Sequence, residues 1–153
     1  MAEWSPELTL NHELLDEQHV GLFRRLEEAA VALDAGAAAA VRSAVAGFAD
    51  ALLEHLAAEE ALMEETLYPE RTRHKAAHEL FTADLTQMRG ELELHGPTPA
   101  VADWIRTRAP EWLRFHIRVN DLPFGAHLAR RSAPQQAPER SARRRPAPPK
   151  RLS

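Results

Sequence analysis

The sequence contains no cysteine. Disulfide frameworks, thiolate zinc sites, iron–sulfur clusters and cysteine nucleophiles are therefore excluded together, and any bound metal must be held by histidine and carboxylate side chains. Also missing is a run of about 18 apolar residues, the length that a membrane-spanning helix requires. The N-terminal residues lack the basic-then-apolar order of a signal peptide. We therefore expect a cytoplasmic protein.

The chain of 153 residues is 44% hydrophobic and 27% charged, which suffices for one core of ordinary size. Residues 130–153 hold eight of the 19 basic residues and one of the 23 acidic residues, which leaves residues 1–129 with a net charge of about −11. Because residues 130–153 contain almost nothing apolar, we expect one domain over 1–129 and a disordered Pro/Arg-rich tail over 130–153. That tail is either a flexible solubilising segment or a weak contact for acidic partners or nucleic acid.

Apolar residues recur at helical spacing in four stretches, and no period-two run of β-branched residues predicts a strand. Asn11 is the predicted N-cap of the first helix, Pro69 takes a first helical position in the third, and Thr98 caps the fourth. We expect a kink or break at Pro110, which lacks an amide donor. The class is all-α, an antiparallel up-down-up-down four-helix bundle about 30 to 35 Å long. The helices are expected over residues 12–34, 38–66, 69–95 and from 99 onward.

Ionisable residues interrupt the apolar stripe of every predicted helix. A spacing of four places His55 beside Glu59, and His74 beside His78, on adjacent turns about 5 to 6 Å apart, so that each pair can chelate. Burying these groups unpaired would cost on the order of several kcal/mol each, and a bound cation is the simplest compensation. The candidate metal ligands are His19, His55, Glu59, His74, His78, His116 and Asp121.

His116 and Asp121 do not fit this spacing. Five residues on a regular helix turn the second side chain about 140° away from the first, so a regular helix cannot direct both at one metal. Pro123 weakens the helix over the preceding turn, which allows Asp121 to lie in a loosened or π-like turn and point inward. The pair therefore supports a metal site only if the helix is irregular there.

Five histidines and two carboxylates exceed what one ion normally takes and suit two metals that share bridging carboxylates. Two irons fit best. Ferritin-like di-iron oxidases instead use four glutamates with two Glu-x-x-His motifs, and no segment of this sequence supplies such a motif. A histidine-rich shell is less anionic than a glutamate-rich one and favours reversible dioxygen chemistry over substrate oxidation.

The spaced motifs, taken jointly, resemble the hemerythrin family, specifically the single-domain bacteriohemerythrins with their HHE cation-binding domain. Asp16-Glu17-Gln18-His19 is similar to the first-helix signature of that family, and Trp4 to a residue of its N-terminal arm. The resemblance covers about residues 4–128. It rests further on the segment His55-Leu56-Ala57-Ala58-Glu59-Glu60, on Met63, Tyr68-Pro69, His74, His78 and Phe81, and on Trp112-Leu113, His116-Ile117 and Asp121.

The resemblance implies two non-haem iron ions (Fe2+/Fe3+) joined by an oxo or hydroxo bridge. One iron would be held by His74, His78 and His116, and the other by His19 and His55, with an open position for dioxygen. Glu59 and Asp121 would bridge the two. The implied activity is reversible dioxygen binding for storage, delivery or sensing, without enzymatic turnover.

Apolar side chains near the ligands are expected to exclude water from the oxygen-binding pocket. This sequence departs from the family pattern in places. Asn11 and Leu15 replace the commoner glycine and isoleucine, and Leu56 stands where an aromatic residue often follows. Leu56 is thus expected to widen the oxygen pocket, and Pro110 to shift His116. The predicted wall of that pocket comprises Leu22, Phe23, Leu56, Trp112 and Ile117.

Three other histidines fall outside this ligand set, and two other activities remain open. His12, His95 and His127 lack partners at ligand spacing and are expected to be ordinary core or surface residues, and Glu60 a solvated neighbour of Glu59. One alternative function is a di-iron redox enzyme acting on nitric oxide or peroxide, or an iron-donating repair protein. Another is an interaction module that responds to iron or oxygen.

Overall fold

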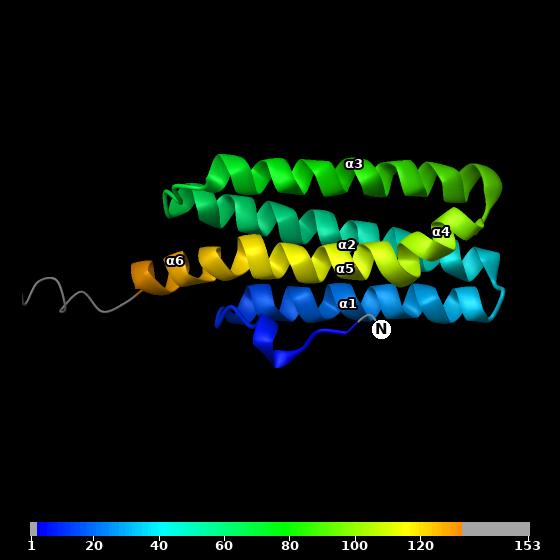
Figure 1. Cartoon of the computed structure of the whole chain (residues 1–153), viewed down its shortest axis with the longest axis horizontal. Coiled ribbons are helices and arrows are strands. Elements are labelled where there is room, and N and C mark those ends of the chain that lie inside the picture. The colour runs from blue at the N-terminus through cyan, green and yellow to red at the C-terminus, as the bar shows by residue number, and fades with distance from the viewer. Residues whose placement is uncertain (1–2, 133–153) are drawn as a thin grey trace, which may run out of the picture.

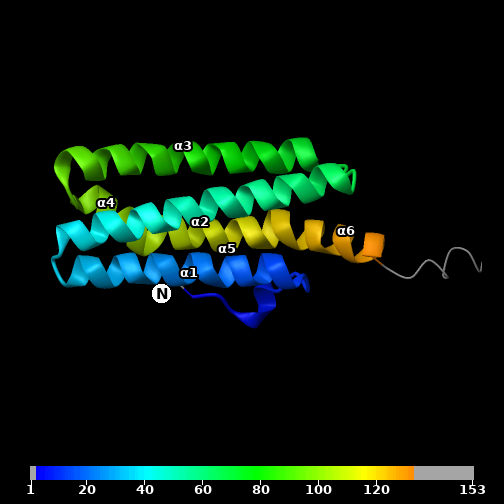
Figure 2. The ribbon, with the colours of Figure 1, turned by 180° about the vertical axis from the view of Figure 1, so that it is seen from behind.

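The computed structural model describes residues 3–132. Within them the chain is an antiparallel four-helix bundle without strands, as predicted, and successive helices run in opposite directions (Figure 1). Figure 2 shows the same arrangement from behind. No helix in this part of the chain is long and apolar enough to cross a membrane. After a 3-10 turn at Pro6–Leu8, the first three helices are α1 (Glu13–Asp34), α2 (Ala38–Glu65) and α3 (Arg71–His95).

The fourth helix of the bundle is a continuous helical stretch over residues 99–132 that contains two π-helical segments. It extends through Arg130 and Arg131, so the first three residues of the segment expected to be disordered are helical. The rest of that tail, 133–153, lies outside the described residues. In chain order the parts are α4 (Pro99–Asp103), π segment η2 (Trp104–Arg108), α5 (Ala109–His116), π segment η3 (Ile117–Asp121) and α6 (Leu122–Ser132).

The cap of α1 differs from the prediction. His12 is the N-cap, and its Nδ1 accepts a hydrogen bond from the N–H of Leu15 at 3.3 Å. Asn11 instead has φ of 59°, a left-handed conformation that asparagine tolerates better than most residues other than glycine. The prediction was wrong because an N-cap needs extended backbone, and the turn at Asn11 removes it from that conformation.

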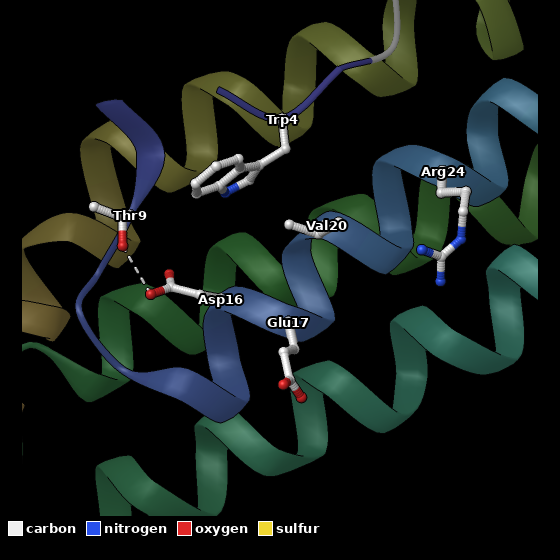
Figure 3. A pocket seen from close by; sticks show the side chains of 6 residues that line it. All are labelled: Trp4, Thr9, Asp16, Glu17, Val20 and Arg24. Carbon is white, nitrogen blue, oxygen red and sulfur yellow. Dashed lines mark hydrogen bonds between the residues drawn. The ribbon is translucent and has the colours of Figure 1, made fainter. Parts of the chain in front are cut away.

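Asp16 holds the segment that precedes α1. Its carboxylate accepts hydrogen bonds from the Thr9 hydroxyl at 2.8 Å, from the N–H of Leu10 at 2.8 Å and from the N–H of His12 at 3.2 Å. Figure 3 shows Thr9 and Asp16 facing each other, with the indole of Trp4 beside a surface groove of about 500 Å³. The N-terminal arm is thereby folded back onto α1.

Helix α3 begins two residues later than predicted. Pro69 lies in the turn between α2 and α3, and the first helical residue is Arg71, because the chain uses the intervening residues to reverse its direction. The other end of α3 agrees with the prediction. Gly96, with φ of 77°, ends the helix, and the side chain of Thr98 caps α4 by accepting an N–H of its first turn at 3.3 Å.

Pro110 bends the fourth helical stretch without breaking it. In a regular helix its ring would collide with the carbonyl of Arg106. The preceding turn widens instead into η2, where the N–H of Ala109 donates to the carbonyl of Trp104, five residues earlier. Figure 1 shows α4 inclined to α5. The expected kink is present, and residues 99–132 contain no break.

Trp104 anchors η2 in the core. Its ring is 1% exposed and lies edge-on to Phe48, with 6.1 Å between the ring centroids. Its Nε1–H donates to the carboxylate of Asp84 on α3 at 2.7 Å, and the same carboxylate accepts from Arg108 at 3.1 Å. The π segment is thus tied to α3 by one partly buried hydrogen bond and one exposed ion pair.

We expect Asp84→Ala to lower the free energy of unfolding by about 1 to 3 kcal/mol, because the indole N–H of Trp104 then remains buried without an acceptor. Urea denaturation followed by helical circular dichroism measures the change. The matched control is Arg108→Ala, which removes only the exposed ion pair and should cost less than about 1 kcal/mol. Equal losses in the two variants would contradict a special role for the buried contact.

Candidate metal centre

The structure brings all seven predicted ligands together in the middle of the bundle, one or two from each helix. All are at most 3% exposed. Two overlapping groups form, and in each group the nitrogen and oxygen atoms lie within 4.8 Å of one another. Both groups include Glu59 and Asp121. The larger group adds His74, His78 and His116, and the smaller group adds His19 and His55.

Glu59 lies between the two groups and turns one oxygen toward each. Its Oε1 is 3.3 Å from Nε2 of His74 and 3.0 Å from Nε2 of His78. Its Oε2 is 3.2 Å from Nε2 of His55 and 3.7 Å from Nε2 of His19. One carboxylate therefore faces both sets of imidazoles at once.

Asp121 divides its oxygens in the same way. Its Oδ1 is 2.9 Å from Nε2 of His74 and 3.1 Å from Nε2 of His116, whereas Oδ2 is 3.0 Å from Nε2 of His19. Two carboxylates that each present one oxygen to each group are the arrangement that a pair of bridged cations needs.

The helix is irregular where His116 and Asp121 require it. Residues Ile117–Asp121 form the π segment η3, and the N–H of Leu122 donates to the carbonyl of Ile117, five residues earlier. In π geometry, residues five apart lie nearly above one another, so Asp121 turns inward beneath His116. Pro123, which has no N–H, follows directly. The π-like turn expected from the spacing is confirmed.

The polar atoms at the centre fit metal ions better than they fit one another. Ligand atoms about 2.1 Å from one ion and about 90° apart would be separated by about 3 Å, the spacing observed here. Many of these atoms lie close together without hydrogen-bond geometry, as expected for lone pairs that converge on a common point. Within residues 3–132, the buried atoms at the centre without a hydrogen-bond partner are both ring nitrogens of His19 and of His74, Nε2 of His116, Oε2 of Glu59 and both carboxylate oxygens of Asp121.

The pKa values of two imidazoles and of both carboxyls at the centre are shifted in opposite directions. Burial lowers the pKa of the His19 and His74 rings, but the nearby carboxylates of Asp121 and Glu59 outweigh it and raise both pKa values to about 9. Burial raises the pKa of the two carboxyls, yet the surrounding imidazoles hold both well below the ordinary range. The carboxylates are thus anionic acceptors at neutral pH, and binding of a metal must displace protons from the imidazoles.

Two residues that support the centre were missed by sequence reasoning. Nδ1 of His55 donates to Oε1 of Gln18 at 2.7 Å, and Nδ1 of His78 donates to the carboxylate of Glu60 at 2.9 Å. Each bond fixes the ring proton on Nδ1 and leaves Nε2 free for a metal. The prediction that Glu60 is merely a solvated neighbour was wrong, because α3 brings His78 against it. Nothing in the local sequence signals either contact.

Of the predicted oxygen-pocket residues, Trp112 packs directly against a candidate ligand. Trp112 stacks on His116, with ring centroids 4.5 Å apart and planes inclined by 10°, and also stacks on Phe81. It therefore lies beside the larger group. The remaining four of the five, which are all buried, are Leu22, Phe23, Leu56 and Ile117.

The three histidines left out of the predicted ligand set lie outside both groups. His12 caps α1, and His95 is exposed at the end of α3. His127 is buried, and its Nε2 lies 3.0 Å from the carbonyl oxygen and 3.0 Å from the hydroxyl of Thr66. All three thus have the ordinary structural surroundings that were expected.

Comparison with known proteins agrees with the geometry. Residues 10–125 match the model of the Hemerythrin HHE cation binding domain, a range that includes all seven candidate ligands. The chain is similar to a bacteriohemerythrin of Stenotrophomonas maltophilia, with 31% identity over 129 residues and 82% of each chain covered. It is 28% identical to a Pseudomonas aeruginosa bacteriohemerythrin over 79% of this chain and 77% of that one. It is also 26% identical to a myohemerythrin of Sipunculus nudus, over 82% of this chain and 92% of that one.

We expect Glu60→Ala to weaken metal binding about 10- to 100-fold, because His78 loses the acceptor that orients its ring. Competition with a chromogenic chelator for zinc or ferrous iron measures the dissociation constant. Glu60→Gln, which keeps an acceptor oxygen, should recover part of the loss. Glu65→Ala, an exposed position on the same helix, should leave the constant unchanged. Equal affinities in wild type and Glu60→Ala would refute the supporting role.

Proposed function

Because the chain belongs to the hemerythrin family, we propose that it binds dioxygen reversibly at a non-haem di-iron centre. The observation that carries the proposal is the pair of overlapping ligand groups that share both buried carboxylates. A single ion would not need two carboxylates that each face two sets of imidazoles. The proposed role is oxygen storage, delivery or sensing in the cytoplasm, without turnover of a substrate.

The two irons would have unequal numbers of protein ligands. His74, His78 and His116 would hold one iron, and His19 and His55 the other, with Glu59 and Asp121 bridging them beside an oxo or hydroxo group. The smaller group has one histidine fewer, and this difference supports an open position on its iron. With one ferrous ion in each group, the centre would supply the electrons that dioxygen binding requires, and the iron of the smaller group would supply the vacant coordination position.

The surrounding side chains would exclude water from the centre. Leu22, Phe23 and Ile117 are each at most 1% exposed, and Leu56 is 5% exposed. An apolar wall limits proton access and slows loss of bound oxygen to side reactions. Trp112, by its stacking on His116, would instead hold a ligand of the other iron in place.

The experiment that tests the proposal is iron per chain by elemental analysis, combined with absorption spectra of anaerobically reduced protein before and after exposure to air. We expect two irons per chain and an absorption band that appears in air, persists, and disappears when oxygen is removed. His116→Ala should lower the iron content, whereas His95→Ala, at an exposed position, should not. Chains without iron would refute the di-iron centre. Two irons with a band that never forms, or that vanishes at once, would favour redox enzymology instead.

Removal of residues 133–153 is expected to leave both iron content and the oxygen-dependent band unchanged, because all seven candidate ligands lie within the bundle. The same measurements on the shortened chain check this expectation. If the basic tail contacts acidic partners or nucleic acid, its loss would change only salt-dependent binding to them. A shortened chain that loses iron would show that the tail contributes to the centre.

A further inference from the structure

A small cavity opens between the start of α3 and the segment η3. Its volume is about 80 Å³. The rim is formed by exposed side chains, among them Val119 and the ion pair between Arg73 and Glu70, whose N···O distance is 3.0 Å. The floor is formed by Tyr68 and His74, which are 6% and 1% exposed. The cavity therefore leads from the surface to one candidate iron ligand.

His74 needs an acceptor that the described residues do not provide. Its Nε2 faces the two shared carboxylates, so a metal held there would leave the ring proton on Nδ1. That Nδ1 is buried and has no hydrogen-bond partner within residues 3–132. His55 and His78, by contrast, donate their Nδ1 protons to protein side chains. Within the same residues Nδ1 of His19 also lacks a partner, but of these two rings only that of His74 lines this cavity.

We propose that this cavity holds ordered water that accepts the Nδ1 proton of His74 and gives solvent access to that ligand. The inference rests on the proposed metal centre, since a bound metal fixes the proton on Nδ1. The volume of about 80 Å³ accommodates two or three waters at about 30 Å³ each. The Tyr68 hydroxyl, the Asn120 amide and the Glu70 carboxylate, all on the cavity lining, supply the further polar partners that a buried water needs.

Solvent would then reach the centre at the larger ligand group. None of the predicted oxygen-pocket residues lines this cavity, and neither His19 nor His55 does. Burial, together with the charge of Glu70, raises the pKa of Tyr68, so its hydroxyl stays protonated and available as a donor to water. Water exchange and oxygen binding would therefore occur at different ligand groups.

The first test is a high-resolution crystal structure of the zinc-loaded full chain, grown once in chloride and once in bromide. We expect a water oxygen within about 3.2 Å of Nδ1 of His74 in both crystals. An anomalous bromide peak at that position would show an anion site and overturn the assignment to water. An empty cavity, or an Nδ1 that donates to a protein atom, would overturn it as well.

The second test measures exchange of the histidine Nδ1 protons in solution, by nuclear magnetic resonance of the zinc-loaded, 15N-histidine-labelled full chain. Zinc is diamagnetic and binds no dioxygen, so the result does not depend on oxygen chemistry. We expect the proton of His74 to exchange at least tenfold faster than those of His55 and His78. Asn120→Leu, which fills the cavity, should slow His74 alone, and Arg118→Gln, at an exposed neighbour outside the cavity, should not.

The outcomes separate the inference from the proposed function. If the His74 proton of the zinc-loaded chain exchanges as slowly as the other two, the proposed solvent access through the cavity is overturned. The proposed metal centre is not affected by that result. Uniform slowing of all three protons in Asn120→Leu would show that exchange occurs through general opening of the bundle. It would also overturn the proposed solvent access through the cavity. A chain that takes up neither zinc nor iron overturns both.

Discussion

Burial of two carboxylates and five imidazoles in one layer of the bundle is the constraint on which the rest of the structure depends. Each helix contributes at least one of these groups, so the layer joins all four. Buried charges require paired neighbours, and here every carboxylate oxygen lies within 4 Å of an imidazole nitrogen. Many of these pairs nevertheless lack hydrogen-bond geometry, so a bound metal would satisfy the layer better than its own members do.

The fourth helical stretch adapts to this layer through its prolines. Both π segments end two residues before a proline: η2 ends before Pro110, and η3 ends before Pro123. The first widening accommodates the ring of Pro110 and seats Trp104 against Asp84. The second turns Asp121 toward the other ligands. A proline that weakens the regular helix thus allows Asp121 to point toward the other ligands, whereas a regular helix would direct its carboxylate elsewhere.

Local sequence predicted much of this arrangement, and the failures have physical causes. Spacing of four residues predicted the pairs of candidate ligands on α2 and α3, which the structure places in one cluster, and Pro123 indicated the π turn. Asn11 was wrongly predicted as a cap, because a left-handed turn depends on how Asp16 holds the preceding segment. Glu60 was misjudged since its contact with His78 spans 18 residues of chain and exists only once two helices pack.

The sequence by itself determined the fold class, the four helices and the identity of the buried polar residues, because periodicity and residue type act over one or two turns. Only the tertiary structure decided how the seven side chains divide into two groups and which oxygen of each carboxylate faces which group. It also decided which of the histidine Nδ1 atoms have a protein acceptor. These depend on the relative placement of helices, which side-chain packing sets and no local pattern records. For the same reason, the cavity behind His74 exists only where α3 meets the widened turn of the last helix.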